Sequence, residues 1–298
     1  MKTLIDILTP HNSIAIAGMS KNSGKTTTLN HLINGFNAQG ICLGLTSIGL
    51  DGEQTDLVTN TPKPRIFAPC GSIIATAEKL LTTRNRDICG IAKEILSVTD
   101  IHTPLGRIAV ARTLSGGAVM LAGPSATAQI PPLIYDMSAF GAQKIIVDGA
   151  VGRKSLAMPN IAQAVVLCVG AALSKSMDSV IMQTRHITDI FNLPEADLQS
   201  EHVYIPGAVT DAKLIDLYDK YVVADDASKI LITPPALEKM RIRGGALAVK
   251  RHINLAAVTI NPISPYGTDF NAAQFLEKIQ AAINVPAYNI GGENYTGT

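Results

Sequence analysis

Short apolar runs alternate along the chain with segments in which apolar residues recur at helical spacing. The first run, SIAIAG at 13–18, is continuous and ends in glycine, which is typical of a strand buried on both faces. The next segment, 25–40, places four apolar residues on one helical face: Leu29, Leu32, Ile33 and Phe36. The chain therefore opens with a predicted strand that turns directly into a predicted helix.

The same alternation continues to the end of the chain. Further strands are predicted at 41–49, 107–114, 118–123, 144–150, 162–170, 202–208, 221–225, 253–262 and in PAYNI near the end. Helices are predicted at 71–98 as a pair, and at 125–140, 176–191 (capped by Ser176), 210–220 and 269–284. The glycines between 107–114 and 118–123 favour a hairpin or two neighbouring strands. Alternating strands and helices indicate βαβ units, so we expect an α/β fold with a mostly parallel sheet.

No shift in composition marks a domain boundary. The main interruption is TNTPKPRIFAPCG at 59–71, where three prolines require an irregular loop. We therefore expect one domain over residues 1–298, with insertions.

Composition narrows the classes of function. Hydrophobic residues make up 47% of the 298 residues and charged residues 16%, which excludes disorder for most of the chain. The net charge is +1, the 25 basic residues are scattered, and aromatic residues are only 4%. These values argue against nucleic acid and against an anionic membrane surface as the main partner.

Four widely spaced cysteines, Cys42, Cys70, Cys89 and Cys168, form no C-x-x-C pair, so neither a zinc site nor a disulfide framework is indicated. Cys42 and Cys168 lie in apolar runs and are interpreted as small buried side chains. The N-terminal segment is a poor signal peptide, and the longest apolar stretches fall short of the roughly 20 residues of a spanning helix. We expect a cytoplasmic protein.

The stretch GMSKNSGKT at 18–26 carries the clearest chemistry. A phosphate-binding loop of the form G-x-x-x-x-G-K-[ST] would have its first glycine at 19, where Met19 stands, one place after Gly18. The stretch nevertheless joins a predicted strand to a predicted helix, the context that this motif requires. We therefore expect main-chain N–H groups here to bind nucleotide phosphates, through Asn22, Ser23, Gly24, Lys25, Thr26 and Thr27.

Five polar side chains are candidates for specific roles in the same site. Lys25 is expected to reach the β- and γ-phosphates, and Thr26 to bind Mg²⁺ through its hydroxyl. Asp148 ends the apolar run KIIVD, as a Mg²⁺-binding carboxylate does. Asp51 and Glu53 follow the second predicted strand and are candidates to hold Mg²⁺ (Asp51) or to orient the attacking water, although solvated acids in a Gly-rich loop would look the same.

Arg153 stands in the loop GAVGRKS after Asp148, where it is interpreted either as an anion-binding residue or as part of an ordinary polar loop. Lys21 is interpreted as a solvent-facing loop residue. The six histidines are scattered, which argues against a metal-delivery site. The chain has no N-K-x-D sequence for guanine, which favours adenine.

The loop GMSKNSGKT resembles that of the dethiobiotin-synthetase-like branch of P-loop proteins, in which glycine, five residues and G-K-T is usual. That resemblance implies the three-layer α/β/α sandwich of P-loop NTPases. It also implies that an asparagine before a proline-containing loop, here Asn261, contacts the base; a plain turn former is the competing interpretation. Some relatives carry a second lysine that reaches across a dimer, so a homodimer is a further possibility, although the spacing of Lys21 differs from theirs.

Further segments suggest a narrower family: LGLTSIGLDGE, DLVTNTPKPRI, VDGAVGRKS and, more loosely, AVVLCVGAALSKSMDSV. Together with the loop they resemble the ATPase-like subunits of reactivating factors for the adenosylcobalamin-dependent lysine 5,6-aminomutase. This resemblance implies a protein that uses ATP and Mg²⁺, with the mutase and a companion subunit as partners, to release damaged cobalamin. The chain has no D-x-H-x-x-G cobalamin motif. The alternatives are an ATP-dependent small-molecule ligase resembling dethiobiotin synthetase and a non-hydrolysing or GTP-binding module.

Overall fold

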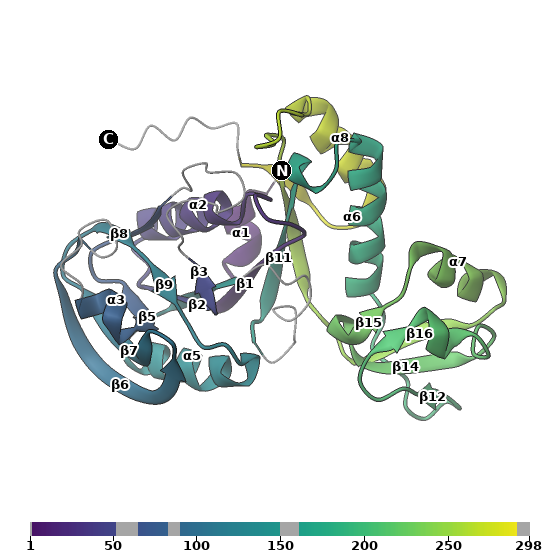
Figure 1. Cartoon of the computed structure of the whole chain (residues 1–298), viewed down its shortest axis with the longest axis horizontal. Helices are drawn as coiled ribbons and strands as arrows, with labels where there is room; N and C mark the ends of the chain where they lie inside the picture. The colour runs from purple at the N-terminus through teal and green to yellow at the C-terminus, as the bar shows by residue number, and fades with distance from the viewer. Residues whose placement is uncertain (1, 52–64, 83–89, 150–160, 291–298) are drawn as a thin grey trace.

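The structure, a computed structural model, describes residues 2–51, 65–82, 90–149 and 161–290 (Figure 1). Within these ranges, nine strands form one large sheet in the order β18-β17-β11-β1-β10-β2-β5-β7-β6. The strands are β1 (Ser13–Gly18), β2 (Leu43–Ile48), β5 (Ile73–Ala77), β6 (Lys93–Thr103), β7 (Gly106–Thr113), β10 (Lys144–Gly149), β11 (Ala164–Gly170), β17 (Leu255–Asn261) and β18 (Ala287–Asn289). Every neighbouring pair from β18 to β5 is parallel, whereas β7 is antiparallel to β5 and β6. The predicted α/β fold with a mostly parallel sheet is confirmed.

Helices cover both faces of this sheet. They are α1 (Leu4–Leu8), α2 (Lys25–Ala38), α3 (Glu78–Thr82), α5 (Ile130–Ala139), α6 (Met177–Phe191) and α8 (Ala272–Ala282), whereas α7 (Pro234–Ile242) lies beside a second, smaller sheet (Figure 1). α1 and α2 share a core cluster with Ile16 and Ile146, whereas α5, α6 and α8 pack on the opposite face, against alternate residues such as Ala17 and Val147. All six residues of β1 are buried, because helices lie on both of its sides. The arrangement is compatible with a three-layer α/β/α sandwich.

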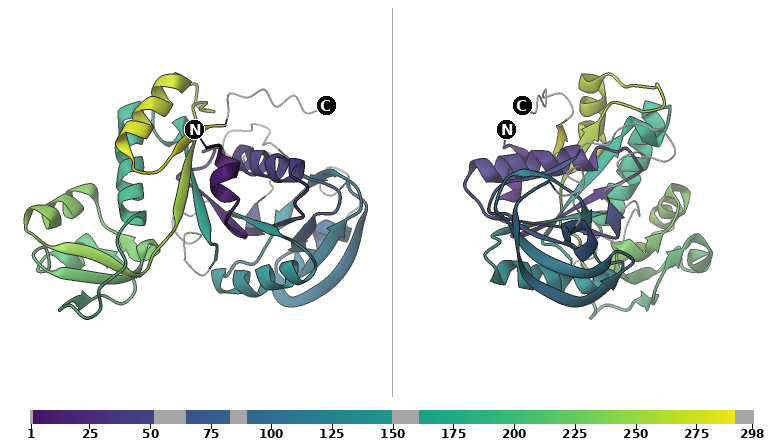
Figure 2. Two further views of the ribbon diagram at one scale, coloured as in Figure 1. Left: turned by 180° about the vertical axis from the view of Figure 1, so that it is seen from behind. Right: turned by 60° about the vertical axis from the view of Figure 1, so that its left-hand side comes forward.

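A smaller parallel sheet is formed by residues between α6 and β17. Its order is β12-β14-β16, with bounds Val203–Tyr204, Tyr221–Asp226 and Ala246–Arg251. Figure 2 shows this sheet and α7 set to one side of the large sheet. Buried residues of the small sheet nevertheless belong to the same core cluster as the α6-facing residues of β1 and β11. The single domain over 1–298 stays a prediction.

Three two-stranded pairs complete the described structure. They are β3 (Leu50–Asp51) with β9 (Leu121–Ala122), β4 (Ile66–Ala68) with β8 (Gly117–Val119), and β13 (Val209–Thr210) with β15 (Ile230–Leu231). Residues 107–114 and 118–123 form neither the predicted hairpin nor a pair of neighbouring strands, because β7 pairs with β5 and β6. β8 and β9 pair instead with β4 and β3, which come from other parts of the chain.

The helix pair predicted at 71–98 is also wrong. Residues 73–77 form β5, a short helix α3 follows, and residues 93–103 form β6. All five residues of β5 are buried, and a short, mostly apolar segment without alternation does not distinguish a buried strand from a buried helix. The segment 210–220 contains only a 3-10 helix, Asp211–Leu214, and then turns in which Leu217 N and Lys220 N each donate to the carbonyl three residues earlier.

Other predicted helices are confirmed. α5 and α8 fall within the predicted ranges 125–140 and 269–284, and the Ser176 hydroxyl caps α6 by accepting from Ser179 N at 3.3 Å. Cys168 is buried as predicted, whereas Cys42 is only partly buried. No helix among the described residues is long and apolar enough to cross a membrane.

β6 lies at one edge of the large sheet and is its longest described strand, with 11 residues. Its pairing with β7 is interrupted twice, between Ile95 and Ser97 and between Val98 and His102. Each interruption shifts the register of the ladder, as a β-bulge does.

Candidate functional site

The turn between β1 and α2 has an unusual backbone. β1 ends at Gly18 and α2 begins at Lys25, so residues 19–24 make the whole connection. Asn22 has φ 59° and Gly24 has φ 90°, and Asn22 is the only non-glycine residue with positive φ in the described part of the chain. Two left-handed residues within three positions curl the main chain tightly, and such curls present N–H groups to one concave side. α2 also begins without a side-chain cap, which leaves the N–H groups of its first turn available.

Two glycines on neighbouring strands make room for this curl. A Cβ on Gly18 would lie 2.5 Å from Ser23 Oγ, and a Cβ on Gly170, the last residue of β11, would lie 2.9 Å from Ser23 Cα. Both distances are far below van der Waals contact. The curl therefore sits directly on the ends of β1 and β11, which explains why glycine stands at 18. Sequence analysis missed Gly170, although it ends an apolar strand just as Gly18 does.

The Met19 side chain packs on the face of the large sheet that is opposite to α2. Its side chain is buried in the core cluster that also contains residues of α6, and its Sδ accepts from Thr184 Oγ1 at 3.6 Å. The position at which the usual motif has glycine is thus used for core packing here. The shifted glycine and the methionine form one consistent arrangement.

Two hydroxyl groups within this turn have no hydrogen-bond partner in the part of the chain that the structure describes. Ser23 Oγ and Ser20 Oγ are buried and have no hydrogen-bond partner in the described structure. Buried hydroxyls are normally hydrogen-bonded, so two in one short loop fit a site that accepts a polar ligand. Lys25, the first residue of α2, has only 9% of its side chain exposed, whereas Lys21 is exposed, as predicted. Thr26 and Thr27, in the first turn of α2, are half-buried.

Asp148 lies on the strand next to β1. It is 1% exposed, and its Cα partners are Ile16 of β1 and Ser47 of β2. Because Ile146 packs on the α2 face, strand alternation directs Asp148 to that face too, the side on which Lys25 lies. The charge of Lys25 acts to lower the pKa of the Cys168 thiol and the charge of Asp148 acts to raise it, so both charges lie within electrostatic range of that thiol.

A buried polar cluster lies beneath the turn. Thr28 of α2, Cys168 of β11 and Thr259 of β17 form a triangle: the two hydroxyls are 2.9 Å apart, and Cys168 Sγ lies 3.4 Å from Thr28 Oγ1 and 3.2 Å from Thr259 Oγ1. Burial raises the pKa of the Cys168 thiol, while the two threonine hydrogen bonds act to lower it. The cluster ties the first turn of α2 to two strands, and sequence analysis missed it because the three residues are far apart in the chain.

Asn261, the last residue of β17, contacts the curl directly. Its Nδ2 donates to the Asn22 carbonyl at 3.1 Å, and its Oδ1 accepts from Ile263 N at 3.2 Å. The carboxamide thus has partners within the protein at both ends. Its contact with a nucleotide base stays a prediction.

The remaining predicted residues are less well placed. Asp51 ends β3, just beyond β2 at the carboxyl edge of the sheet, but its side chain is not described. Glu53 and Arg153 lie outside the described residues. Their roles in orienting water or binding anions stay predictions. Within the described ranges, no group of three or more histidine, cysteine, aspartate or glutamate residues could hold a metal ion by itself. One carboxylate beside a threonine and a phosphate is the kind of ligand set that Mg²⁺ commonly uses.

Strand order also points to this edge of the sheet. From β1 the chain runs to β2, on the β10 side of β1, whereas from β11, which pairs with β1 on its other side, it runs to β17 in the opposite direction. Ligands of open α/β sheets bind at the carboxyl ends of strands where the connections diverge in this way. The curl at 19–24 stands at that position.

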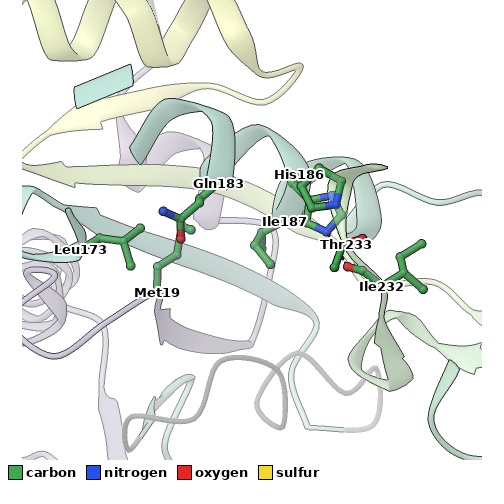
Figure 3. A pocket seen from close by; sticks show the side chains of 8 residues that line it. Met19, Leu173, Gln183, His186, Ile187, Ile232 and Thr233 are labelled. Carbon is green, nitrogen blue, oxygen red and sulfur yellow. Dashed lines mark hydrogen bonds between the residues drawn. The ribbon is translucent and has the colours of Figure 1, made fainter. Parts of the chain in front are cut away.

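A cavity of about 260 Å³ opens beside Met19 (Figure 3). Its walls come from the ends of β1 and β11, from α6 and from the segment before α7, and the lining residues are Met19, Leu173, Gln183, His186, Ile187, Ile232, Thr233 and Pro234. His186 Nε2 lies 2.9 Å from the Ile232 carbonyl, which links α6 to the segment between β15 and α7. A mostly apolar cavity with a few polar groups is typical of a small-molecule site. Sequence analysis did not predict it, because its walls come from distant segments.

No family model, no curated protein and no solved structure matches this chain.

Proposed function

We propose that this chain is a P-loop NTPase that binds ATP with Mg²⁺ at the turn between β1 and α2. The observation that carries the proposal is the curl at 19–24, set at the start of an uncapped helix, with two buried hydroxyls that lack partners and with the buried Lys25 beside it. A curl of N–H groups at a helix N-terminus favours phosphate, since both the hydrogen bonds and the helix dipole attract anions.

The roles of the residues follow from charge and position. Main-chain N–H groups of 22–27 bind the phosphate oxygens, and the Lys25 ammonium offsets charge on the β- and γ-phosphates. Mg²⁺ would be held by Thr26 and Asp148, and it supplies charge neutralisation between the phosphates. In hydrolysis, a water oxygen bonds to the γ-phosphorus while the bond to the bridging oxygen breaks, which yields ADP and phosphate. Asp51 or Glu53 orients that water.

We further propose that ATP turnover acts on a partner enzyme. The resemblance of the loop and of four later segments to reactivating-factor ATPases supports this assignment, with adenosylcobalamin-dependent lysine 5,6-aminomutase as the partner and a companion subunit. A nucleotide-dependent protein can favour an open mutase only by the difference in its affinity for the two mutase states. The homodimer stays a prediction.

An ATPase assay with and without the inactivated mutase and fresh coenzyme tests this function. We expect ATP turnover to rise several-fold when the inactivated mutase is present, because hydrolysis is coupled to its opening. Active mutase serves as the control and should stimulate less. Turnover that is the same with and without the inactivated mutase would contradict the proposed partner.

A second candidate function, a small-molecule ligase, is favoured by the cavity beside Met19 (Figure 3). A substrate held there would lie next to the first residue of the phosphate-binding turn. This function predicts that a protein-free metabolite extract stimulates ADP formation without any protein partner. Ile187→Trp fills the cavity and should abolish this stimulation while ATP affinity is unchanged.

Met182→Trp is the matched control, since Met182 lies on the same helix but is 57% exposed and does not line the cavity. If the extract produces no stimulation, or if both variants respond alike, the ligase is not the function.

A further inference from the structure

We propose that Asn261 is a positioning residue that holds the phosphate-binding curl in shape, and that it does not read the nucleotide base. The inference rests on the proposed function, because it assigns a role within the same site. Asn261 is the last residue of β17, two strands from β1, yet its side chain reaches the middle of the turn 19–24.

The side chain of Asn261 forms a hydrogen bond to the curl at 19–24. Asn261 Nδ2 donates to the Asn22 carbonyl at 3.1 Å. The peptide bond is planar and trans, so the carbonyl of Asn22 and the N–H of Ser23 point in opposite directions. Holding that carbonyl towards Asn261 therefore turns the Ser23 N–H away from Asn261. The hydrogen bond sets the orientation of a peptide group in the turn that receives the phosphates.

This hydrogen bond is made to a residue, Asn22, with an unusual backbone conformation. Asn22 has φ 59°, a left-handed conformation that few non-glycine residues adopt. Such a conformation persists only where the surroundings stabilise it. The Asn261 hydrogen bond supplies a specific contact at this residue.

The side chain of Asn261 is also closely packed. A Cβ on Gly24 would lie 3.0 Å from Asn261 Cβ, and a Cβ on Gly170 would lie 3.3 Å from the Asn22 carbonyl oxygen. Asn261 Oδ1 also accepts from Ile263 N at 3.2 Å, which fixes the rotamer of the carboxamide. The Asn261 side chain therefore has hydrogen bonds at both ends of its carboxamide, and the curl packs against the ends of both β11 and β17.

The two roles of Asn261 make different predictions about ligands. A residue that reads adenine matters for ATP and not for a triphosphate without a base. A residue that shapes the curl matters equally for every ligand that carries the triphosphate.

The test measures the affinity of wild type and Asn261→Ala for ATP, GTP and inorganic triphosphate, each with Mg²⁺. We expect the affinity of the variant to fall about tenfold for all three ligands, as the loss of one supporting hydrogen bond predicts. Asn261→Asp keeps the shape and the acceptor for Ile263 N but cannot donate to Asn22, so it should lose at least as much. This second variant removes the donor while it keeps the volume of the side chain, and its added negative charge also opposes binding of the anionic ligands.

Asn254→Ala is the matched control. Asn254 stands immediately before β17, at its other end, and donates through Nδ2 to the Gln163 carbonyl at 2.9 Å, so it removes a similar bond far from the turn. Its affinities should equal those of wild type. Thermal unfolding of all variants checks that the fold persists.

A loss confined to ATP would overturn the inference in favour of base recognition, and unchanged affinity for all three ligands would overturn it outright. Wild-type protein that binds none of the three would instead overturn the proposed function, and the inference with it. The two failures are therefore distinguishable.

Discussion

Replacement of Lys25 by alanine is expected to lower the affinity for ATP by at least about a hundredfold. The Lys25 side chain is buried at the start of α2, where its ammonium would make charge-assisted hydrogen bonds to phosphate that no other residue replaces. Each tenfold loss corresponds to about 1.4 kcal/mol, and two such bonds account for the expected effect. Isothermal titration with ATP and Mg²⁺ measures it directly.

Lys21→Ala is the control for this experiment, since Lys21 is an exposed lysine of the same loop. Its affinity should stay within about twofold of wild type, because an exposed charge is screened by solvent. Circular dichroism should show that both variants remain folded. Equal affinities for Lys25→Ala and wild type would refute the nucleotide site.

Replacement of Phe36 by alanine is expected to lower the free energy of unfolding by about 3–5 kcal/mol, as for other large buried aromatic residues. The Phe36 side chain is 0% exposed and belongs to the core cluster that joins α1 and α2 to the sheet. Because α2 begins at the candidate site, its anchoring also holds the turn in place. Urea denaturation followed by circular dichroism measures the change.

Phe67→Ala is the matched control, because the Phe67 side chain is 57% exposed. Its loss should stay below about 1 kcal/mol, since little apolar surface leaves water when it folds. Losses of similar size in the two variants would mean that the packing of α2 described above is incorrect.

The sequence predicted those parts of the fold that depend on local signals. β1, β10 and β11 are mostly apolar runs, and Ser176 caps α6 as predicted. The segments that were predicted wrongly lack such local signals. Residues 73–77 are apolar except for Thr76 and show no alternation, so only their pairing with β2 and β7 makes them a strand.

The candidate site likewise has one part that local sequence signals predict and another part that they do not. The turn at 18–26 was predictable because its residues are consecutive in the chain, and their types and spacing resemble a phosphate-binding motif. Gly170, Asn261 and the Thr28–Cys168–Thr259 cluster act through contacts between distant strands, which one sequence does not reveal. For Asn261 the resemblance to dethiobiotin-synthetase-like proteins implied a contact with the nucleotide base, whereas the structure gives its carboxamide two partners within the protein.

The two interruptions in the ladder of β6 have a consequence for self-association. An edge strand of 11 residues with a regular row of free N–H and C=O groups would be a template on which another chain could add a strand and begin to aggregate. The register shifts beside Ile95 and Val98 break that row, and they do so where two apolar side chains are partly exposed. The edge that most needs protection from fibre-like growth is thus the one that carries the irregularities.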